Sequence, residues 1–180
     1  MNTYIALLRG INVSGQKKIL MAEFRILLEK NGFLNVQTYI QSGNVVFNSP
    51  ATDVHELASQ MEQVISIQYG FEVPTLVLSP QEIRLAVEQN PFKENPSMDE
   101  TQTYFTFLKE QPSKEGIQAF EATSYPEETF ILKDKVVYYS CAIGFGKAKF
   151  TNRMMEKKLG TRSTTRNNKT IQKLISMTQS

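Results

Sequence analysis

This sequence contains little of what most catalytic and metal sites are built from. It has one cysteine, one histidine and no tryptophan in 180 residues. A single cysteine, Cys141, excludes an internal disulfide and is typical of a reducing compartment. No apolar run approaches the roughly 20 residues of a membrane-spanning helix, and the N-terminus lacks a basic region followed by an apolar stretch. We therefore expect a soluble, cytoplasmic protein with no membrane partner.

The few reactive side chains do not form a recognisable catalytic or metal-binding pattern. No His, Cys or Asp cluster has metal-ligand spacing, so we expect neither a metal nor a cofactor. His55 falls on the polar side of an expected helix, where a solvated position is the favoured interpretation. Cys141 lies late in an apolar strand pattern, as a small core residue does. Ser42 has no evident base near it in the predicted layout, so the sequence identifies no reaction.

Charge is distributed unevenly along the chain, although the net charge is only +2. Residues 141–180 contain nine Lys or Arg and one acid, Glu156, giving a formal charge of +8, while residues 1–140 carry −6. A basic segment of this kind can attract phosphate-rich partners. We favour another interpretation, that it docks on the acidic remainder or forms the solvated face of a helix, because amphipathic helices commonly carry Lys on their wet side.

The first half of the chain predicts a complete ferredoxin-like unit. Apolar runs and alternating patterns predict strands, and apolar residues at helical spacing predict helices. Ser42-Gly43, between two alternating segments, predicts a tight hairpin. The expected order is βαββαβ, with strands over residues 3–9, 36–40, 44–48 and 73–78 and helices over 20–31 and 54–69.

The second half repeats this pattern less regularly, after a helix and a polar linker over residues 80–102. The expected elements are strands over 103–108, 128–133, 136–142 and 161–165 and helices over 113–122, 151–159 and 167–177. The predicted fold class is α+β. It consists of two ferredoxin-like (βαββαβ) subdomains, residues 1–79 and 103–180, the second less regular and with extra helices.

Two polar turns of the first subdomain are expected to meet at one sheet edge. The two strands of a βαβ crossover run parallel, so the loop after the first strand and the hairpin after the second lie at the same end. The first helix begins there too, with its free N–H groups and positive dipole end, which suits a phosphate or carboxylate. The alternative is that Ser42-Gly43-Asn44 serves only the hairpin and Arg9 pairs with an acid. The candidate donors are Arg9, Asn12, Gln41, Ser42 and Asn44, with Lys17 and Lys18 as further cations.

A second candidate donor set lies near the starts of the last two helices, if the fourth strand of the second subdomain forms. It contains Lys149, Thr165, Arg166 and Asn167. Gly144-Phe145-Gly146-Lys147 lacks the GxxxxGK[ST] spacing of a phosphate-cradling loop, so nucleotide hydrolysis of that type is disfavoured. The alternative role for Thr165 or Asn167 is a helix cap.

A nucleic-acid interaction is the second function class, possible but not favoured. It would use the basic C-terminal segment and an aromatic sheet face, as ferredoxin-like RNA binders do. Neither half shows the basic-Gly-aromatic signature of those proteins, and aromatics at strand spacing are usually core. The candidate stacking residues are Tyr4, Tyr39 and Phe47, or Tyr104, Phe105, Tyr138 and Tyr139.

Three segments together resemble a known bacterial family. They are LRGINVSG at 8–15, NGFLNVQTYIQSGNVVF at 31–47 and KFTNRMMEKKLGTRSTTRNNKTIQKL at 149–174, and they look like domain of unknown function 1697 over essentially the whole chain. The resemblance implies two ferredoxin-like subdomains packed together and no established activity. This chain departs from the family pattern at Ser14-Gly15, where two glycines are frequent, and at Asn168, where Trp is frequent. The positions it marks are Arg9, Gly10, Asn12, Gln41, Ser42, Gly43, Asn44, Thr165, Arg166 and Asn167.

The leading hypothesis is a protein that binds an anionic small molecule at a sheet edge or in a cleft between the subdomains. One alternative is a nucleic-acid-binding protein that uses the basic segment. The other is an enzyme that acts on a phosphorylated or acidic metabolite and uses Arg, Lys and Asn for electrostatic stabilisation.

Overall fold

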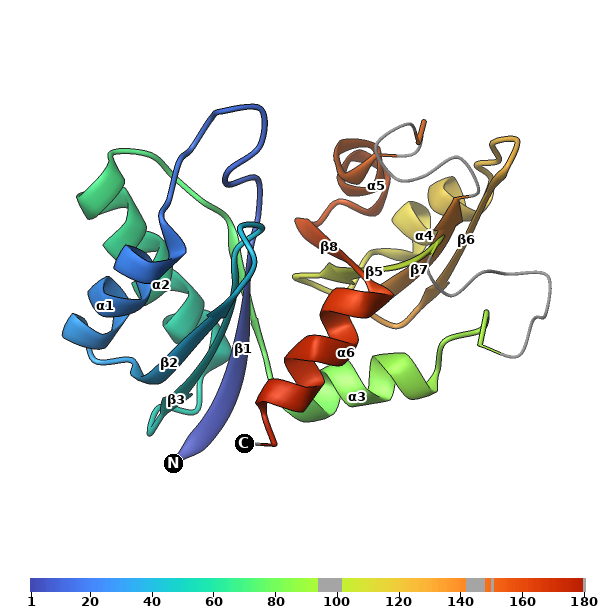
Figure 1. The fold of residues 1–180 in the computed structure, drawn as a ribbon. Coiled ribbons are helices and arrows are strands. Elements are labelled where there is room, and N and C mark those ends of the chain that lie inside the picture. Colours follow the sequence, from blue (N-terminus) through green and yellow to red (C-terminus); the bar gives the residue numbers. More distant parts are fainter. Residues whose placement is uncertain (94–101, 142–147, 150, 180) are drawn as a thin grey trace. The chain divides into compact units, whose positions relative to one another are not determined.

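The computed structural model describes residues 1–93, 102–141, 148–149 and 151–179 (Figure 1). The described chain divides into two compact units, Met1–Arg84 with Lys173–Ser180, and Leu85–Gln172. These differ from the expected subdomains 1–79 and 103–180, because the last residues of the chain group with the first unit. Within that unit, Arg84 Nη2 donates a hydrogen bond to Thr178 Oγ1 at 3.2 Å.

The first unit has the predicted βαββαβ order and an antiparallel sheet in the order β2-β3-β1-β4. In β1, Leu7 pairs with Asn44 of β3 and Leu8 pairs with Thr75 of β4. Helices α1 and α2 cover one face of this sheet (Figure 1). The elements are β1 (Asn2–Leu8), α1 (Met21–Lys30), β2 (Leu34–Tyr39), β3 (Asn44–Ser49), α2 (Val54–Tyr69) and β4 (Thr75–Leu78).

The core of the first unit follows from the period of the apolar residues. Alternate β1 residues, such as Ala6 and Leu8, pack against Phe24 and Leu28 of α1 and against Met61 of α2. Ile5 and Leu7, on the other face of β1, are buried as well, which explains why residues 4–8 form a continuous apolar run. Asp53 caps the N-terminus of α2, because its Oδ1 accepts from the N–H groups of residues 55 and 56.

The second unit also has a four-stranded antiparallel sheet, in the order β6-β7-β5-β8. Phe120 of α4 and Met155 and Leu159 of α5 pack on the face that carries Val137 and Tyr139. The elements are β5 (Thr103–Leu108), α4 (Lys114–Glu121), β6 (Glu128–Lys133), β7 (Val136–Cys141), α5 (Asn152–Leu159) and β8 (Ser163–Asn167). The predicted fourth strand therefore forms, and the α+β fold class with two βαββαβ repeats is confirmed.

Two further helices, α3 (Pro80–Glu88) and α6 (Asn168–Met177), each contain a boundary between the units. Ser79 and Glu82 form a capping box at the start of α3: Ser79 N–H donates to Glu82 Oε2 at 2.8 Å, and Glu82 N–H donates to Ser79 Oγ at 3.2 Å. Within the predicted helix and linker over residues 80–102, residues 94–101 lie outside the described residues.

Candidate functional site

Three chain segments meet at the end of the first sheet where β1 and β2 finish. They are residues 9–20, 40–44 and 72–74, here called the loop cluster. Leu8 N–H donates to the Gly43 carbonyl at 2.8 Å, and Arg9 N–H donates to the Pro74 carbonyl at 2.9 Å. The predicted meeting of the first loop with the hairpin is therefore present, and the segment before β4 joins them.

Asn12 holds this cluster together through its side chain. Its Nδ2 donates to the carbonyls of Ile19 at 3.0 Å and Gln41 at 2.8 Å, and its Oδ1 accepts from the Ile19 N–H at 2.9 Å. One amide therefore closes the loop over residues 12–19 and fastens it to the hairpin. This use of both amide atoms makes Asn12 a positioning residue of the loops.

The hairpin is shaped by Gly43 and Asn44. Gly43 has φ +80°, and a Cβ built there would lie 2.7 Å from Leu8 Cβ and 2.8 Å from Ile11 Cδ1. Asn44 is fully buried, and its Nδ2 donates to the Tyr39 carbonyl and to Ser42 Oγ, both at 2.9 Å. Both residues fix the turn from inside, as the hairpin interpretation of this motif expects.

The loop has an unusual backbone. Asn12, Ser14 and Lys17 have φ values of 55°, 49° and 45°, in addition to the positive φ of Gly10 and Gly15. Non-glycine residues in the left-handed region each cost on the order of 1 kcal/mol, and such residues cluster at functional sites. The loop therefore adopts one demanding conformation, which the Asn12 hydrogen bonds maintain.

The loop itself carries three cationic residues, Arg9, Lys17 and Lys18. Arg9 is half-buried and Lys18 is exposed. Lys17 Nζ donates to the Glu72 carbonyl at 2.6 Å, which ties the loop to the third segment. Gln41 and Ser42 are exposed at the hairpin. The first turn of α1 also lies here; its N-cap residue, Leu20, makes no side-chain hydrogen bond to the helix.

The pleat of β8 places the strand residues of the second predicted donor set on two opposite faces of the sheet. Thr165 and Asn167 pair with Thr106 and Tyr104 of β5, whereas Arg166 pairs with Phe105 and so lies on the opposite face. The Thr165 hydroxyl lies 2.7 Å from the Thr106 hydroxyl, and it also donates to Asn152 Oδ1.

The remaining members of this set have different surroundings. Asn167 Oδ1 accepts from the Thr170 N–H at 2.9 Å, so Asn167 caps α6, as its alternative role predicts. Lys149 is exposed. Residues 144–147, the predicted GxGK turn, lie outside the described residues.

Arg166 is the most deeply buried cation of the predicted sites. Its side chain is 8% exposed, and its Nη1 donates to the Thr165 carbonyl at 2.9 Å. Burial lowers the pKa of the guanidinium to about 10, because the charged form loses solvation. Arg166 therefore stays charged at neutral pH in surroundings that disfavour the charge.

Sequence reasoning missed Glu128, which organises the end of the second sheet. This buried carboxylate accepts the Tyr139 hydroxyl through Oε2 at 2.7 Å and the Lys149 N–H through Oε1 at 2.7 Å. Burial, followed by the Cys141 and Glu128 neighbours, raises the pKa of Tyr139. The only local signal was an acidic residue at the start of a strand that has apolar residues at alternate positions.

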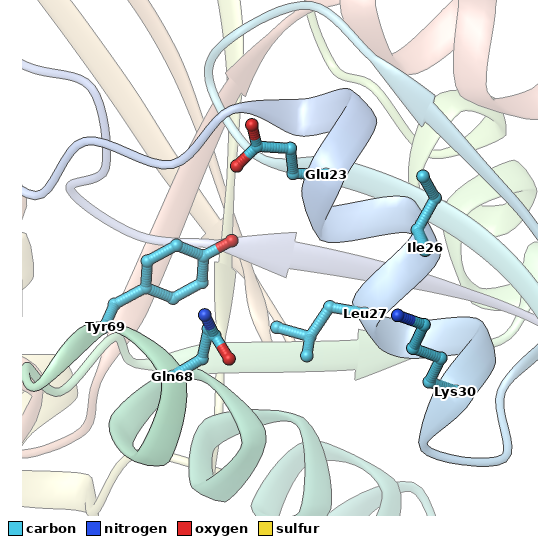
Figure 2. Close-up of a pocket in the computed structure, with 6 residues that line it drawn as sticks. All are labelled: Glu23, Ile26, Leu27, Lys30, Gln68 and Tyr69. Carbon is cyan, nitrogen blue, oxygen red and sulfur yellow. The ribbon is translucent and has the colours of Figure 1, made fainter.

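Sequence reasoning also missed a groove between α1 and α2 (Figure 2). Its volume is about 270 Å³, and Leu27 points across it toward Gln68 and Tyr69. Burial and the Glu23 charge raise the pKa of Tyr69. The groove carries one acid and one base, Glu23 and Lys30, so it lacks the cationic character of the loop cluster.

Other sequence expectations concern stacking residues, reactive side chains and metals. Of the candidate stacking aromatics, Tyr4, Phe47, Phe105, Tyr138 and Tyr139 are buried. Cys141 is a buried core residue and His55 is exposed, as expected. Among the described residues no group of three His, Cys, Asp or Glu could hold a metal ion. Over the same residues, no helix has the length and apolar character needed to cross a bilayer.

Comparisons with known proteins agree with this fold. A family model described as "Protein of unknown function (DUF1697)" matches residues 1–138, which include the loop cluster and end before β8. A solved structure of the conserved bacterial protein SP0830 from Streptococcus pneumoniae is similar, with a TM-score of 0.79 and 25% sequence identity. That match covers 100% of this chain and 99% of the other. No curated protein matches significantly.

Proposed function

The chain belongs to the family described as "Protein of unknown function (DUF1697)", and from its geometry we propose that it binds a small phosphate- or carboxylate-bearing anion at the loop cluster. The observation that carries the proposal is the set of three Asn12 side-chain hydrogen bonds, here called the Asn12 clamp. A loop that contains three left-handed non-glycine residues, together with Arg9 and Lys18, is held by hydrogen bonds of Asn12 within the loop and to the hairpin. A demanding backbone conformation maintained next to cations is what a preorganised anion site requires.

The residues of the cluster divide into two roles. The side-chain amides of Asn12 and Asn44 donate to backbone carbonyls, and that of Asn44 also donates to Ser42 Oγ. These two residues therefore position the turns. Arg9 and Lys18 supply positive charge, and the exposed Gln41 supplies an amide donor. The uncapped first turn of α1 adds N–H groups and the positive end of the helix dipole. The chemical group that this arrangement suits is a compact oxyanion, such as a phosphate or carboxylate group.

A small anion is favoured over a nucleic acid by the burial of the sheet aromatics. Base stacking needs exposed rings, and five of the seven candidate rings are buried. The basic C-terminal segment could still attract nucleic acid through phosphate contacts alone, and such binding would weaken steeply with salt. The second donor set, Lys149, Thr165, Arg166 and Asn167, stays a prediction.

The test is a thermal-shift and calorimetric titration with inorganic phosphate and with citrate. Arg9→Ala should abolish stabilisation of the protein by these anions, because ligand stabilisation scales as RT ln(1 + [L]/Kd). Without anion, the melting temperature should change little, since a partly exposed charge usually contributes about 0–1 kcal/mol.

The matched control is Arg25→Ala on α1. Arg25 belongs to the same unit and forms a surface ion pair with Glu29 at 3.8 Å. This variant should respond to phosphate like the wild type. The proposal is contradicted if neither anion stabilises the wild type, or if Arg9→Ala lowers stability by roughly 2 kcal/mol or more, as loss of a buried pair would.

A further inference from the structure

Three large apolar side chains are exposed at the loop cluster. Val13 is 58% exposed, Leu20 is 61% exposed and Ile40 is 50% exposed. Single exposed apolar residues are ordinary on protein surfaces, but several gathered around a polar site indicate a contact surface. These three come from the loop, the start of α1 and the hairpin.

The Asn12 hydrogen bonds place the three residues around one point. Val13 follows Asn12 in the chain, Leu20 follows Ile19, and Ile40 precedes Gln41. Ile19 and Gln41 are the backbone partners of the Asn12 side chain. Each Cα of the three therefore lies within about 12 Å of the Asn12 Cα, given one hydrogen bond and one peptide step.

Two of the three occupy positions where a polar residue would fit the backbone better. Ile40 has φ +48°, which is unusual for a β-branched residue and is better tolerated by Asn or Gly. Leu20 is the N-cap of α1, where Ser, Thr, Asp or Asn would satisfy a free N–H. Neither side chain gains the burial that usually outweighs such a mismatch.

The cations of the cluster indicate which kind of ligand would fit this apolar surface. Arg9, Lys17 and Lys18 belong to the same segment as Val13 and Leu20. Resting on the proposed function, we infer that the anion carries a hydrocarbon chain. Its phosphate or carboxylate group lies against the cations and its chain lies over Val13, Leu20 and Ile40. The ligand class is a single-chain amphipathic anion, such as an alkyl or acyl phosphate.

The inference predicts that affinity depends on chain length. Calorimetric titration would compare inorganic phosphate, butyl phosphate and octyl phosphate, the last below its micelle concentration. Each fully buried methylene increases affinity about fourfold. The chain would remain partly exposed on this surface, so we expect octyl phosphate to bind at least roughly tenfold more tightly than butyl phosphate.

A triple variant, Val13→Ser, Leu20→Ala and Ile40→Asn, isolates the apolar surface. All three positions are exposed, Ala leaves the first-turn N–H groups of α1 uncapped as Leu20 does, and Asn at positive φ suits the local backbone, so the variant should fold. It should bind phosphate and butyl phosphate like the wild type and lose the preference for octyl phosphate. Ile67→Ser on α2, at a position 77% exposed, is the matched control and should keep that preference.

The possible outcomes separate this inference from the proposed function. Equal affinity for butyl and octyl phosphate would overturn the inference while anion binding stood. An octyl preference that persists in the triple variant would also overturn it, because the chain would lie elsewhere. Failure of phosphate and both esters to bind would remove the proposed function as well. Co-sedimentation with phosphatidylglycerol vesicles, without binding of monomeric octyl phosphate, would replace the single ligand with a membrane surface.

Discussion

One end of each sheet is organised by polar side chains, but the chemistry differs between the two units. In the first unit the loops after β1 and β2 are held by neutral amides, Asn12 and Asn44, while Arg9 is half-buried and Lys18 is exposed. In the second unit the end where β7 and β8 finish has a buried carboxylate, Glu128, and a buried guanidinium, Arg166.

This difference has a physical consequence. Neutral hydrogen bonds hold a loop without dependence on pH and without burying a charge. Buried ionisable groups incur a desolvation cost and make stability depend on pH. The neutral hydrogen bonds of the first unit therefore suit a binding site. The buried charges of the second unit suit a structural role, with a stability that changes at extreme pH.

The largest expected effect tests whether the loop cluster at the end of the first sheet is tightly packed. Gly43→Ala should lower the free energy of unfolding by about 2–4 kcal/mol, because the added Cβ meets Leu8 and Ile11 and the residue is held at positive φ. Urea denaturation followed by circular dichroism would measure the loss.

Gly10→Ala is the matched control for the backbone term. Gly10 has φ +70° with nothing within 4 Å of an added Cβ, so only about 1 kcal/mol should be lost. Equal losses for the two glycines would mean that the hairpin does not pack closely on β1 and the loop.

A smaller effect tests the clamp itself. Asn12→Ala removes three side-chain hydrogen bonds, which should lower the free energy of unfolding by about 2 kcal/mol. Amide hydrogen exchange should increase in residues 10–19 and 40–43 while β5 to β8 stay protected. Exchange that increases in both units would contradict a local role for Asn12.

The smallest effect concerns the second unit at alkaline pH. Burial raises the pKa of Tyr138 to about 12 and also raises the pKa of Tyr139 above its usual value of 10.0. The unfolded chain loses these protons near pH 10 while the folded chain keeps them, so the free energy of unfolding falls as pH rises above about 10. The lowered pKa of Arg166 has the opposite effect, because it makes the free energy of unfolding rise with pH in this range. The net change is therefore the effect of two tyrosines minus that of one arginine.

Urea denaturation at pH 9 and pH 11 would measure this slope. Tyr138→Phe should make it less steep, because it removes one of the two groups that ionise first in the unfolded chain. Tyr138 also donates to the Ala86 carbonyl at 2.9 Å, so the variant should be less stable at both pH values. A slope that is the same in wild type and variant would show that Tyr138 does not titrate with unfolding.

Local sequence patterns determined much of the fold. The continuous apolar run of β1 and the alternation around Ser42-Gly43 depend only on neighbouring residues. They predicted the strands, helices and turns with shifts of one or two residues at most ends. The parallel direction of β1 and β2 then predicted that the first loop meets the hairpin, because a βαβ crossover allows little else.

Only the tertiary structure decided what each polar side chain contacts. Asn12 was a candidate ligand donor by sequence, yet its partners are backbone groups of residues 19 and 41, which no local pattern specifies. Arg166 was grouped with Thr165 and Asn167 until the strand pleat placed it on the other face. The local signal at Glu128 did not reveal its role, because its partners Tyr139 and Lys149 are 11 and 21 residues away. Periodicity is a property of neighbours along the chain, whereas hydrogen-bond partners and burial depend on which distant segments meet.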